Sequence, residues 1–169
     1  LLEKSRNSLD SRGWMLLGDT YLQQGDVKNA KKTYSDWRTS EPDDLNAWLR
    51  GIGVEELTND VENALRLVNE AQSKFPLSNK LTLLEINYLT RMNELSQAKD
   101  LIKKYKANQA YNPQLIRFEG ELALSERKYN EASQLLMKNY QNSQINELIV
   151  LHSLNYYYHH RYSVLDMNY

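Results

Sequence analysis

The sequence contains no cysteine, which excludes disulfide bonds, thiolate metal sites and a cysteine nucleophile. Only three residues are proline and six are glycine, so few positions interrupt a helix. Neither charge sign dominates: 21 basic and 22 acidic residues give a net charge of −1, which offers no electrostatic basis for binding nucleic acid or anionic lipid. No apolar run approaches the roughly 18 residues of a membrane helix, and no signal peptide opens the chain. These absences favour a helical chain whose partner is not a polyanion and whose segment does not enter a membrane.

The most informative feature present is an alanine that recurs every 34 residues. Ala30, Ala64, Ala98 and Ala132 are spaced in this way, and the segments KNAKKTY, ENALRLV, SQAKDLI and NEASQLL align around them without a gap. A second apolar stretch precedes each alanine by 12 to 16 residues, as Trp14 precedes the first one by 16. A fixed period of this length with helical apolar spacing predicts two helices in every unit.

Residues suited to ending and starting helices recur at the same period. Gly25, Asn59 and Asn93 can adopt the left-handed backbone conformation that closes a helix. Arg127 occupies the fourth such position and predicts a weaker helix stop. Asn112 is a favoured N-cap residue for the helix that follows it.

At these residues the pattern resembles the tetratricopeptide repeat (TPR). The first unit carries the family's residue types at Trp14, Leu17, Gly18, Tyr21, Ala30, Tyr34 and Pro42. The resemblance implies an all-α fold, an α-solenoid in which antiparallel helix pairs stack as a right-handed superhelix. The expected units are 1–10 as the tail of a preceding helix, 11–44, 45–78, 79–112 and 113–146 as four repeats, and 147–169 as a partial repeat or C-terminal cap. We expect the chain, which begins at Leu1, to be a piece of a longer array with apolar ends.

The resemblance also implies a binding surface, because the first helices of such repeats line a concave wall that receives peptides or helices. The family's wall positions fall in this sequence on Arg12, Met15, Asp19, Asn46, Leu49, Lys80, Leu83, Asn87, Arg91, Gln114, Arg117 and Glu121. Repeats that clamp a C-terminal carboxylate open with Lys and Asn on this wall. Here Met15 and Asp19 stand at those positions, and an acidic residue argues against that mode of binding.

Catalytic and metal-binding side chains are scarce. The only histidines are His152, His159 and His160, and the first two lie about 10 Å apart along a helix, too far to share a metal. The acidic neighbours, such as Asp43 with Asp44 and Glu55 with Glu56, are typical of solvated caps and helix faces. The tyrosines at 156–158 and 162 suit packing better than ligand stacking. The sequence therefore predicts no enzyme activity, no metal and no cofactor.

Gly18 interrupts the first helix at a cost of about 1 kcal/mol relative to alanine. Its spacing from Ala30 recurs between Gly120 and Ala132, which predicts that these pairs face each other where two helices approach most closely. Gly18 is then a packing residue, and we expect Gly18→Leu to be destabilising. Its neighbour Asp19 is expected to lie on the open wall and to contact a partner.

These features predict a non-catalytic scaffold that binds a peptide or protein in its groove. The stretches GWMLLGDTYLQQGD and GELALSERKYNEA are similar to bacterial TPR proteins of exopolysaccharide and PEP-CTERM protein-sorting export, which implies a periplasmic or envelope location; otherwise the cytoplasm is expected. Two alternatives stay open. The chain could form homodimers through apolar array ends, or it could be an accessory domain of a larger enzyme.

Overall fold

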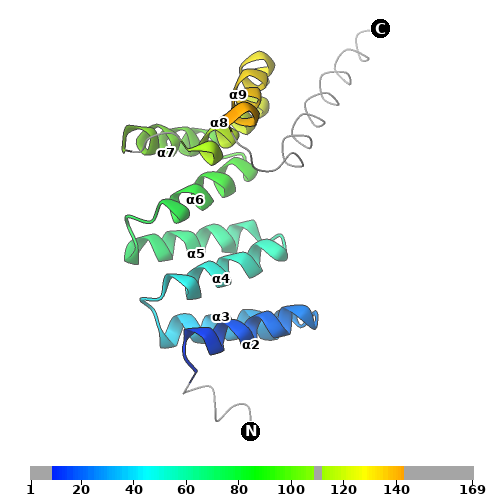
Figure 1. The fold of residues 1–169 in the computed structure, drawn as a ribbon, viewed down its shortest axis with the longest axis vertical. Coiled ribbons are helices and arrows are strands. Elements are labelled where there is room, and N and C mark those ends of the chain that lie inside the picture. The colour runs from blue at the N-terminus through cyan, green and yellow to red at the C-terminus, as the bar shows by residue number, and fades with distance from the viewer. Residues whose placement is uncertain (1–8, 109–111, 143–169) are drawn as a thin grey trace. The chain divides into compact units, whose positions relative to one another are not determined.

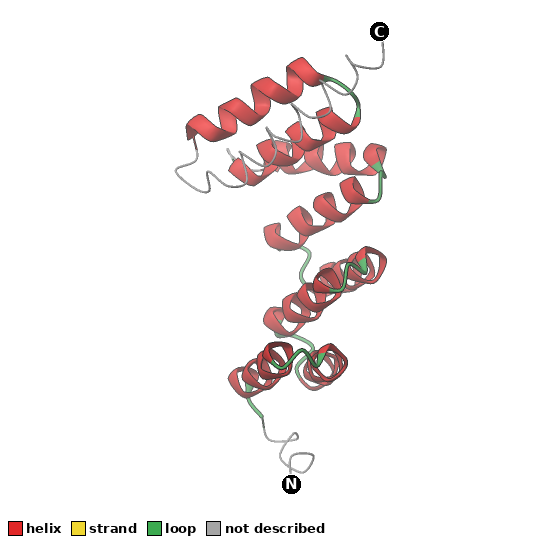
Figure 2. Cartoon of the chain, turned by 90° about the vertical axis from the view of Figure 1, so that its right-hand side faces the viewer, coloured by secondary structure: helices red, strands yellow, loops and turns green. Residues whose placement is uncertain are grey.

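The computed structural model describes residues 9–108 and 112–142, and in these ranges every regular element is a helix (Figures 1 and 2). The helices are α2 (Ser11–Gln23), α3 (Val27–Ser40), α4 (Leu45–Leu57), α5 (Val61–Lys74), α6 (Asn79–Arg91), α7 (Leu95–Asn108), α8 (Pro113–Ser125) and α9 (Tyr129–Asn142). They form sequential antiparallel pairs, so the fold is all-α, as the sequence predicts.

The helix bounds follow the period of the sequence. First helices begin at residues 11, 45, 79 and 113, and second helices begin at 27, 61, 95 and 129. The chain divides into two compact units, Leu1–Tyr88 and Leu89–Tyr169, and each is described separately below as unit 1 and unit 2. Helix α6 contributes its residues up to Tyr88 to unit 1.

The turn inside each helix pair is closed by a residue with a positive φ. Gly25, Asn59 and Asn93 have φ values of 74°, 56° and 63°, which confirms their expected left-handed conformation. Arg127 adopts the same conformation, with a φ of 60°, although it lacks the tolerance of glycine or asparagine for this region. The fourth turn therefore has the geometry of the others and carries more backbone strain.

Side-chain caps start several of the helices. The Asp26 and Asp60 carboxylates accept hydrogen bonds from the backbone N–H groups of Asn29 and Asn63, at 3.1 and 3.2 Å. These bonds and those from the two asparagine side chains lower the pKa of both aspartates. The predicted N-cap at Asn112 is confirmed by its side chain, which accepts from the backbone N–H of Gln114 at 2.9 Å.

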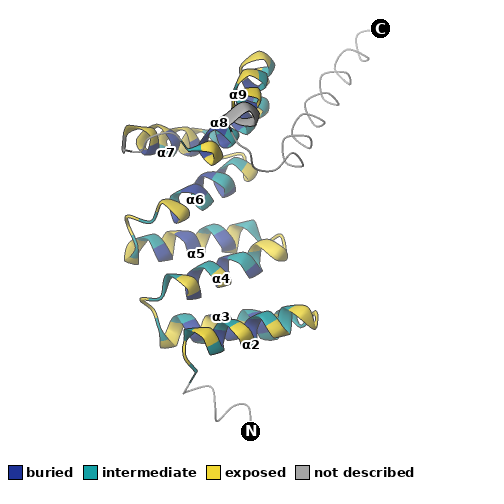
Figure 3. Ribbon diagram, in the orientation of Figure 1, coloured by how far each residue is buried: buried dark blue, intermediate teal, exposed yellow. Residues whose placement is uncertain are grey.

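The core consists of the residues at which the helices of a pair, and successive pairs, press together (Figure 3). The four alanines of the 34-residue period are 0% exposed, which confirms them as packing positions. Two apolar clusters fill unit 1. One contains Trp14, Ala30, Tyr34, Trp37, Ala47 and Val54, and the other Trp48, Ile52, Ala64, Leu67, Val68, Ala71, Leu81 and Tyr88.

Gly18 is buried, but its partner differs from the one that the spacing predicts. A Cβ added at Gly18 would lie 2.5 Å from Cζ and 2.8 Å from the hydroxyl of Tyr34, nearer than any atom of Ala30. Gly120 has the same relation to Leu136, which a Cβ would approach to 2.9 Å. The glycines therefore accommodate a large side chain from one helical turn beyond the alanine, rather than an alanine methyl group.

The second helices α3, α5 and α7 also contact the first helix of the next pair through one recurring pair of positions. The Arg38 guanidinium covers Gly51 and lies 5.7 Å from the centroid of the Trp48 ring. In the later pairs these positions hold side chains that bond each other directly. The bonds are Gln72 to Glu85, at 2.8 Å, and Lys106 to Glu119, at 2.7 Å.

Several predictions lie outside the described residues. They concern the three histidines, the tyrosines at 156–158 and 162, the segment 147–169 and most of the segment 1–10.

Candidate functional site

The exposed side of the first helices is the candidate binding surface. In unit 1, α2 and α4 are joined by an ion pair in which Arg50 Nη1 lies 3.1 Å from Asp19 Oδ1. Helices α4 and α6 are joined by the Tyr88 hydroxyl, which donates to Glu56 at 3.2 Å. These contacts make α2, α4 and residues 79–88 of α6 neighbours, and we call their exposed side the first-helix surface of unit 1.

Asp19 has structural partners on this surface. Its Oδ1 accepts a hydrogen bond from the buried Tyr34 hydroxyl at 2.6 Å in addition to the ion pair with Arg50. Burial, together with the bond to this carboxylate, raises the pKa of Tyr34 well above its ordinary value. Asp19 therefore links α2 to α3 and α4, and its charge is already compensated, which differs from the open position expected for it.

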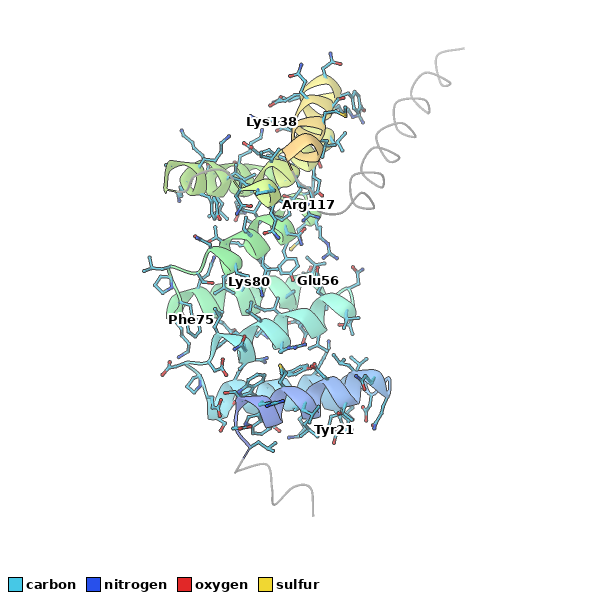
Figure 4. The ribbon with its side chains drawn as sticks, viewed as in Figure 1. Tyr21, Glu56, Phe75, Lys80, Arg117 and Lys138 are labelled. Carbon is cyan, nitrogen blue, oxygen red and sulfur yellow. The ribbon has the colours of Figure 1, made fainter. Side chains whose placement is uncertain are left out.

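The predicted wall residues are distributed over both units. Eight lie in unit 1 and four, from Arg91 onward, lie in unit 2. The exposed ones are Arg12, Asn46, Lys80, Arg91 and Gln114, and the partly exposed ones are Met15, Asp19, Leu49, Asn87, Arg117 and Glu121. Leu83 is only 8% exposed, because it contributes to the core instead of an accessible surface. Figure 4 shows Lys80 at the start of α6 and Arg117 on α8.

On α8, two of the predicted wall residues interact with each other. Arg117 Nε lies 3.8 Å from Glu121 Oε1, and the Arg117 guanidinium lies 4.7 Å from the centroid of the Phe118 ring. Burial raises the pKa of Glu121, and the positive charge of Arg117 opposes that shift. This pair presents a partly desolvated carboxylate next to a cation rather than a free charge.

Three of the four neighbouring acidic residues have structural roles. Asp44 caps α4 by accepting from the backbone N–H of Asn46 at 2.9 Å. Glu55 pairs with Lys31 at 2.6 Å, and Glu56 accepts from Tyr88. Among the residues that the structure describes, no group of three His, Asp or Glu side chains could hold a metal ion.

A groove of about 510 Å³ lies against α7, α8 and α9 in unit 2. Its floor includes the buried Ile102 and Leu122. Most of its charged groups are paired with each other, and the two lysine bonds to Glu126 lower the pKa of that carboxylate. The pairs are Lys99 with Glu126, Lys128 with Glu126, and Lys106 with Glu119.

Sequence reasoning did not identify the partners of Asp19. Tyr34 and Arg50 are 15 and 31 residues away in sequence, and only stacking of the repeats brings them together. One signal was available: Arg50 follows Leu16 by one full period and so lies on the side of α4 that faces the preceding pair. An Arg at a position that holds Leu in the first repeat indicates a polar contact across repeats.

None of the described helices has the length and apolar character needed to span a membrane.

Comparisons with known proteins show the same fold. A tetratricopeptide repeat protein from Parabacteroides merdae superposes with a TM-score of 0.70 at 16% identity, covering 86% of this chain and 57% of its own. A chain of the APC/C hetero-tetramer Cut9–Hcn1 superposes with a TM-score of 0.72 at 18% identity, and the match covers 87% of this chain and 29% of the Cut9–Hcn1 chain. PilF from Pseudomonas aeruginosa superposes with a TM-score of 0.53 at 18% identity, and the match covers 85% of this chain and 79% of the PilF chain.

These likenesses confirm the TPR fold that the 34-residue period predicts. The chain spans little more than half of the first of these proteins and less than a third of the second. No protein-family model and no curated protein sequence matches the chain.

Proposed function

We propose that this chain is a non-catalytic scaffold that binds a peptide or protein segment on its first-helix surface. The observation that carries the proposal is the set of exposed, unpaired side chains on that surface in unit 1. Arg12 and Lys80 are exposed and have no partner among the described residues. Leu57 is 71% exposed at the end of α4. A surface that carries both cations and an apolar side chain is suited to a polypeptide partner.

The fold supports the proposal, since TPR proteins are generally protein–protein interaction scaffolds. The groove against α7, α8 and α9 offers less to a partner, because its floor is part of the core and most of its charged groups are paired. The first-helix surface combines side chains from three helices and so can recognise an extended segment.

A capture experiment tests the proposal. The full chain, an Arg12→Glu/Lys80→Glu variant and a Lys28→Glu/Lys74→Glu control are immobilised and exposed to extract from the source organism. The control reverses the same charges on second helices, where both lysines are exposed. We expect proteins captured by the wild type and the control to be lost from the first variant. Equal capture by all three would show that the first-helix surface is not the binding site.

The narrower part of the proposal is that the partner belongs to a bacterial envelope, exopolysaccharide or protein-export assembly. It is supported by the similarity of the stretches at residues 13–26 and 120–132 to TPR proteins of such systems. Fractionation of the source organism tests this part, because an envelope role requires the parent protein to be found with the envelope.

Self-association is a second candidate, and one observation favours it. Leu16 on α2 is 67% exposed, whereas Leu84, two periods later, packs against the Trp48 cluster. The exposed face of α2 could therefore join a second copy. Light scattering at increasing concentration tests this, since a constant monomer mass would exclude it.

The remaining alternative, an accessory domain of a larger enzyme, is tested by sequencing the parent gene.

A further inference from the structure

The groove of about 510 Å³ in unit 2 has the size of a small-ligand site, since such sites have volumes of about 300–1,000 Å³. Helices α7, α8 and α9 all contribute to it. The described residues that line it lie between Lys99 and Leu135, so the first-helix surface of unit 1 has no part in it. The groove is therefore separate from the proposed peptide-binding surface.

The floor of the groove is aliphatic. Ile102 of α7 and two residues of α8, Leu122 and Ala123, are buried there, and Leu135 of α9 is partly buried. Among the described residues that line the groove, none is aromatic. This floor is suited to an aliphatic chain, which gains by leaving water, rather than to a ring that needs a stacking partner.

Ala123 is smaller than the residues at the same position of the two preceding repeats. Leu89, one period earlier, is buried. Glu55, two periods earlier, pairs with Lys31 at 2.6 Å. Both side chains are larger than the methyl group of alanine. The floor therefore has room at a position that larger side chains occupy in the second and third repeats.

Lysines of α7 form one rim of the groove. Lys99, Lys103 and Lys106 are spaced by four and three residues, so they share one side of the helix, where their aliphatic stems extend the apolar surface. The first and last of them are bonded to carboxylates, Glu126 and Glu119. Lys103 is exposed and has no partner among the described residues. It supplies an uncompensated positive charge at the edge of the aliphatic floor.

The remaining acidic residue of the groove does not compensate Lys103. Glu131 acts on Lys128 instead: a hydrogen bond to Glu126 raises the pKa of Lys128, and the charge of Glu131 adds to that shift. Because most charges in the groove are paired, a ligand with a single anionic end matches it better than a polypeptide with many charges does.

We propose that this groove binds one straight-chain carboxylate of medium length, such as decanoate. Its chain lies against Ile102, Leu122 and Ala123, and its carboxylate pairs with Lys103. This inference goes beyond the proposed function, because it assigns a second site, with a small amphipathic molecule as its ligand.

Isothermal titration calorimetry of the full chain with decanoate tests the proposal, and decanol is the uncharged probe. We expect one decanoate per chain and weaker binding of decanol. Lys103→Gln should weaken decanoate binding about fivefold and leave decanol binding unchanged. Lys28→Gln, which removes the charge of an exposed lysine on α3, is the matched control and should leave both affinities unchanged.

Ala123→Leu tests the floor, because it introduces the side chain that Leu89 provides one period earlier. Decanoate affinity should fall tenfold or more, while thermal melting shows that the variant is folded. Ala123→Val is a smaller obstruction for use if leucine prevents folding. Decanoate binding that resists the folded Ala123 variants, equal affinities for decanol and decanoate, or no binding of decanoate at all would each overturn the proposal. So would loss of decanoate binding in the Arg12→Glu/Lys80→Glu variant, because it would place the ligand on the first-helix surface.

Discussion

Substitution of Gly18 by alanine tests the packing of the first helix pair. In an ordinary helix interior this change stabilises by about 1 kcal/mol. Here the new Cβ would lie 2.5 Å from Cζ of Tyr34, whereas carbon atoms pack best at about 3.5–4.0 Å. Because Tyr34 is 0% exposed and its hydroxyl is bonded to Asp19, its ring has no free space into which it can move.

The expected magnitude follows from three contributions. Overpacking in a well-filled core costs about 1–3 kcal/mol. Displacing the ring weakens a hydrogen bond to a carboxylate, which costs about 1.5 kcal/mol. The helix-propensity gain of about 1 kcal/mol offsets part of this. Gly18→Ala should therefore lower the free energy of unfolding by roughly 1.5–3.5 kcal/mol.

Urea unfolding followed by circular dichroism measures this value, and a double-mutant cycle identifies its cause. In a Tyr34→Val background, which introduces the smaller residue found at Val68 one period later, Gly18→Ala should cost much less. Gly53→Ala is the matched control, since the same change in open space should not be destabilising. A Gly18→Ala variant as stable as the wild type would refute the packing argument. So would an equal cost in both backgrounds.

Two further predictions concern Tyr34 and Arg127. The raised pKa of Tyr34 means that the folded chain keeps this proton after tyrosine in the unfolded chain ionises near pH 10. The free energy of unfolding should therefore fall as the pH rises above that value. Tyr34→Phe should show a smaller fall in the urea midpoint over the same range, and parallel pH profiles of the variant and the wild type would contradict this. Arg127→Gly should raise the free energy of unfolding by about 0.5–1 kcal/mol in urea titrations by relieving the left-handed backbone, and a loss of stability would show that the Arg127 side chain matters more than its φ.

Local chemistry made much of the fold predictable. The left-handed positions at Gly25, Asn59 and Asn93 and the cap at Asn112 each depend on a few adjacent residues, and the 34-residue period repeats this local pattern along the chain. The partner of Gly18 was not predictable in the same way. Pairing it with Ala30 assumed that small residues meet small residues, whereas the buried ring of Tyr34, one turn further along α3, fills the space.

The candidate surface was less predictable, because it depends on contacts between repeats. The exposure of Arg12 and Lys80 agrees with their positions in the repeat. Asp19 has the same kind of position, yet its environment is set by Arg50 from the next pair. Leu83 is buried although its position in the repeat is that of an accessible residue. Period alone fixes which side of a helix a residue occupies, but not what the neighbouring repeat places against it.

The contact between each second helix and the next first helix gives the repeats a fixed order. Arg38 fits over Gly51 because glycine leaves room for the guanidinium, while Gln72 and Lys106 each need the carboxylate that follows them. If α5 were followed by α4 instead of α6, Gln72 would face Gly51 and lose its acceptor. Repeats that look interchangeable in their shared residues are therefore matched to particular neighbours, and a chain with its repeats shuffled should stack less stably than one with the same residues in the native order.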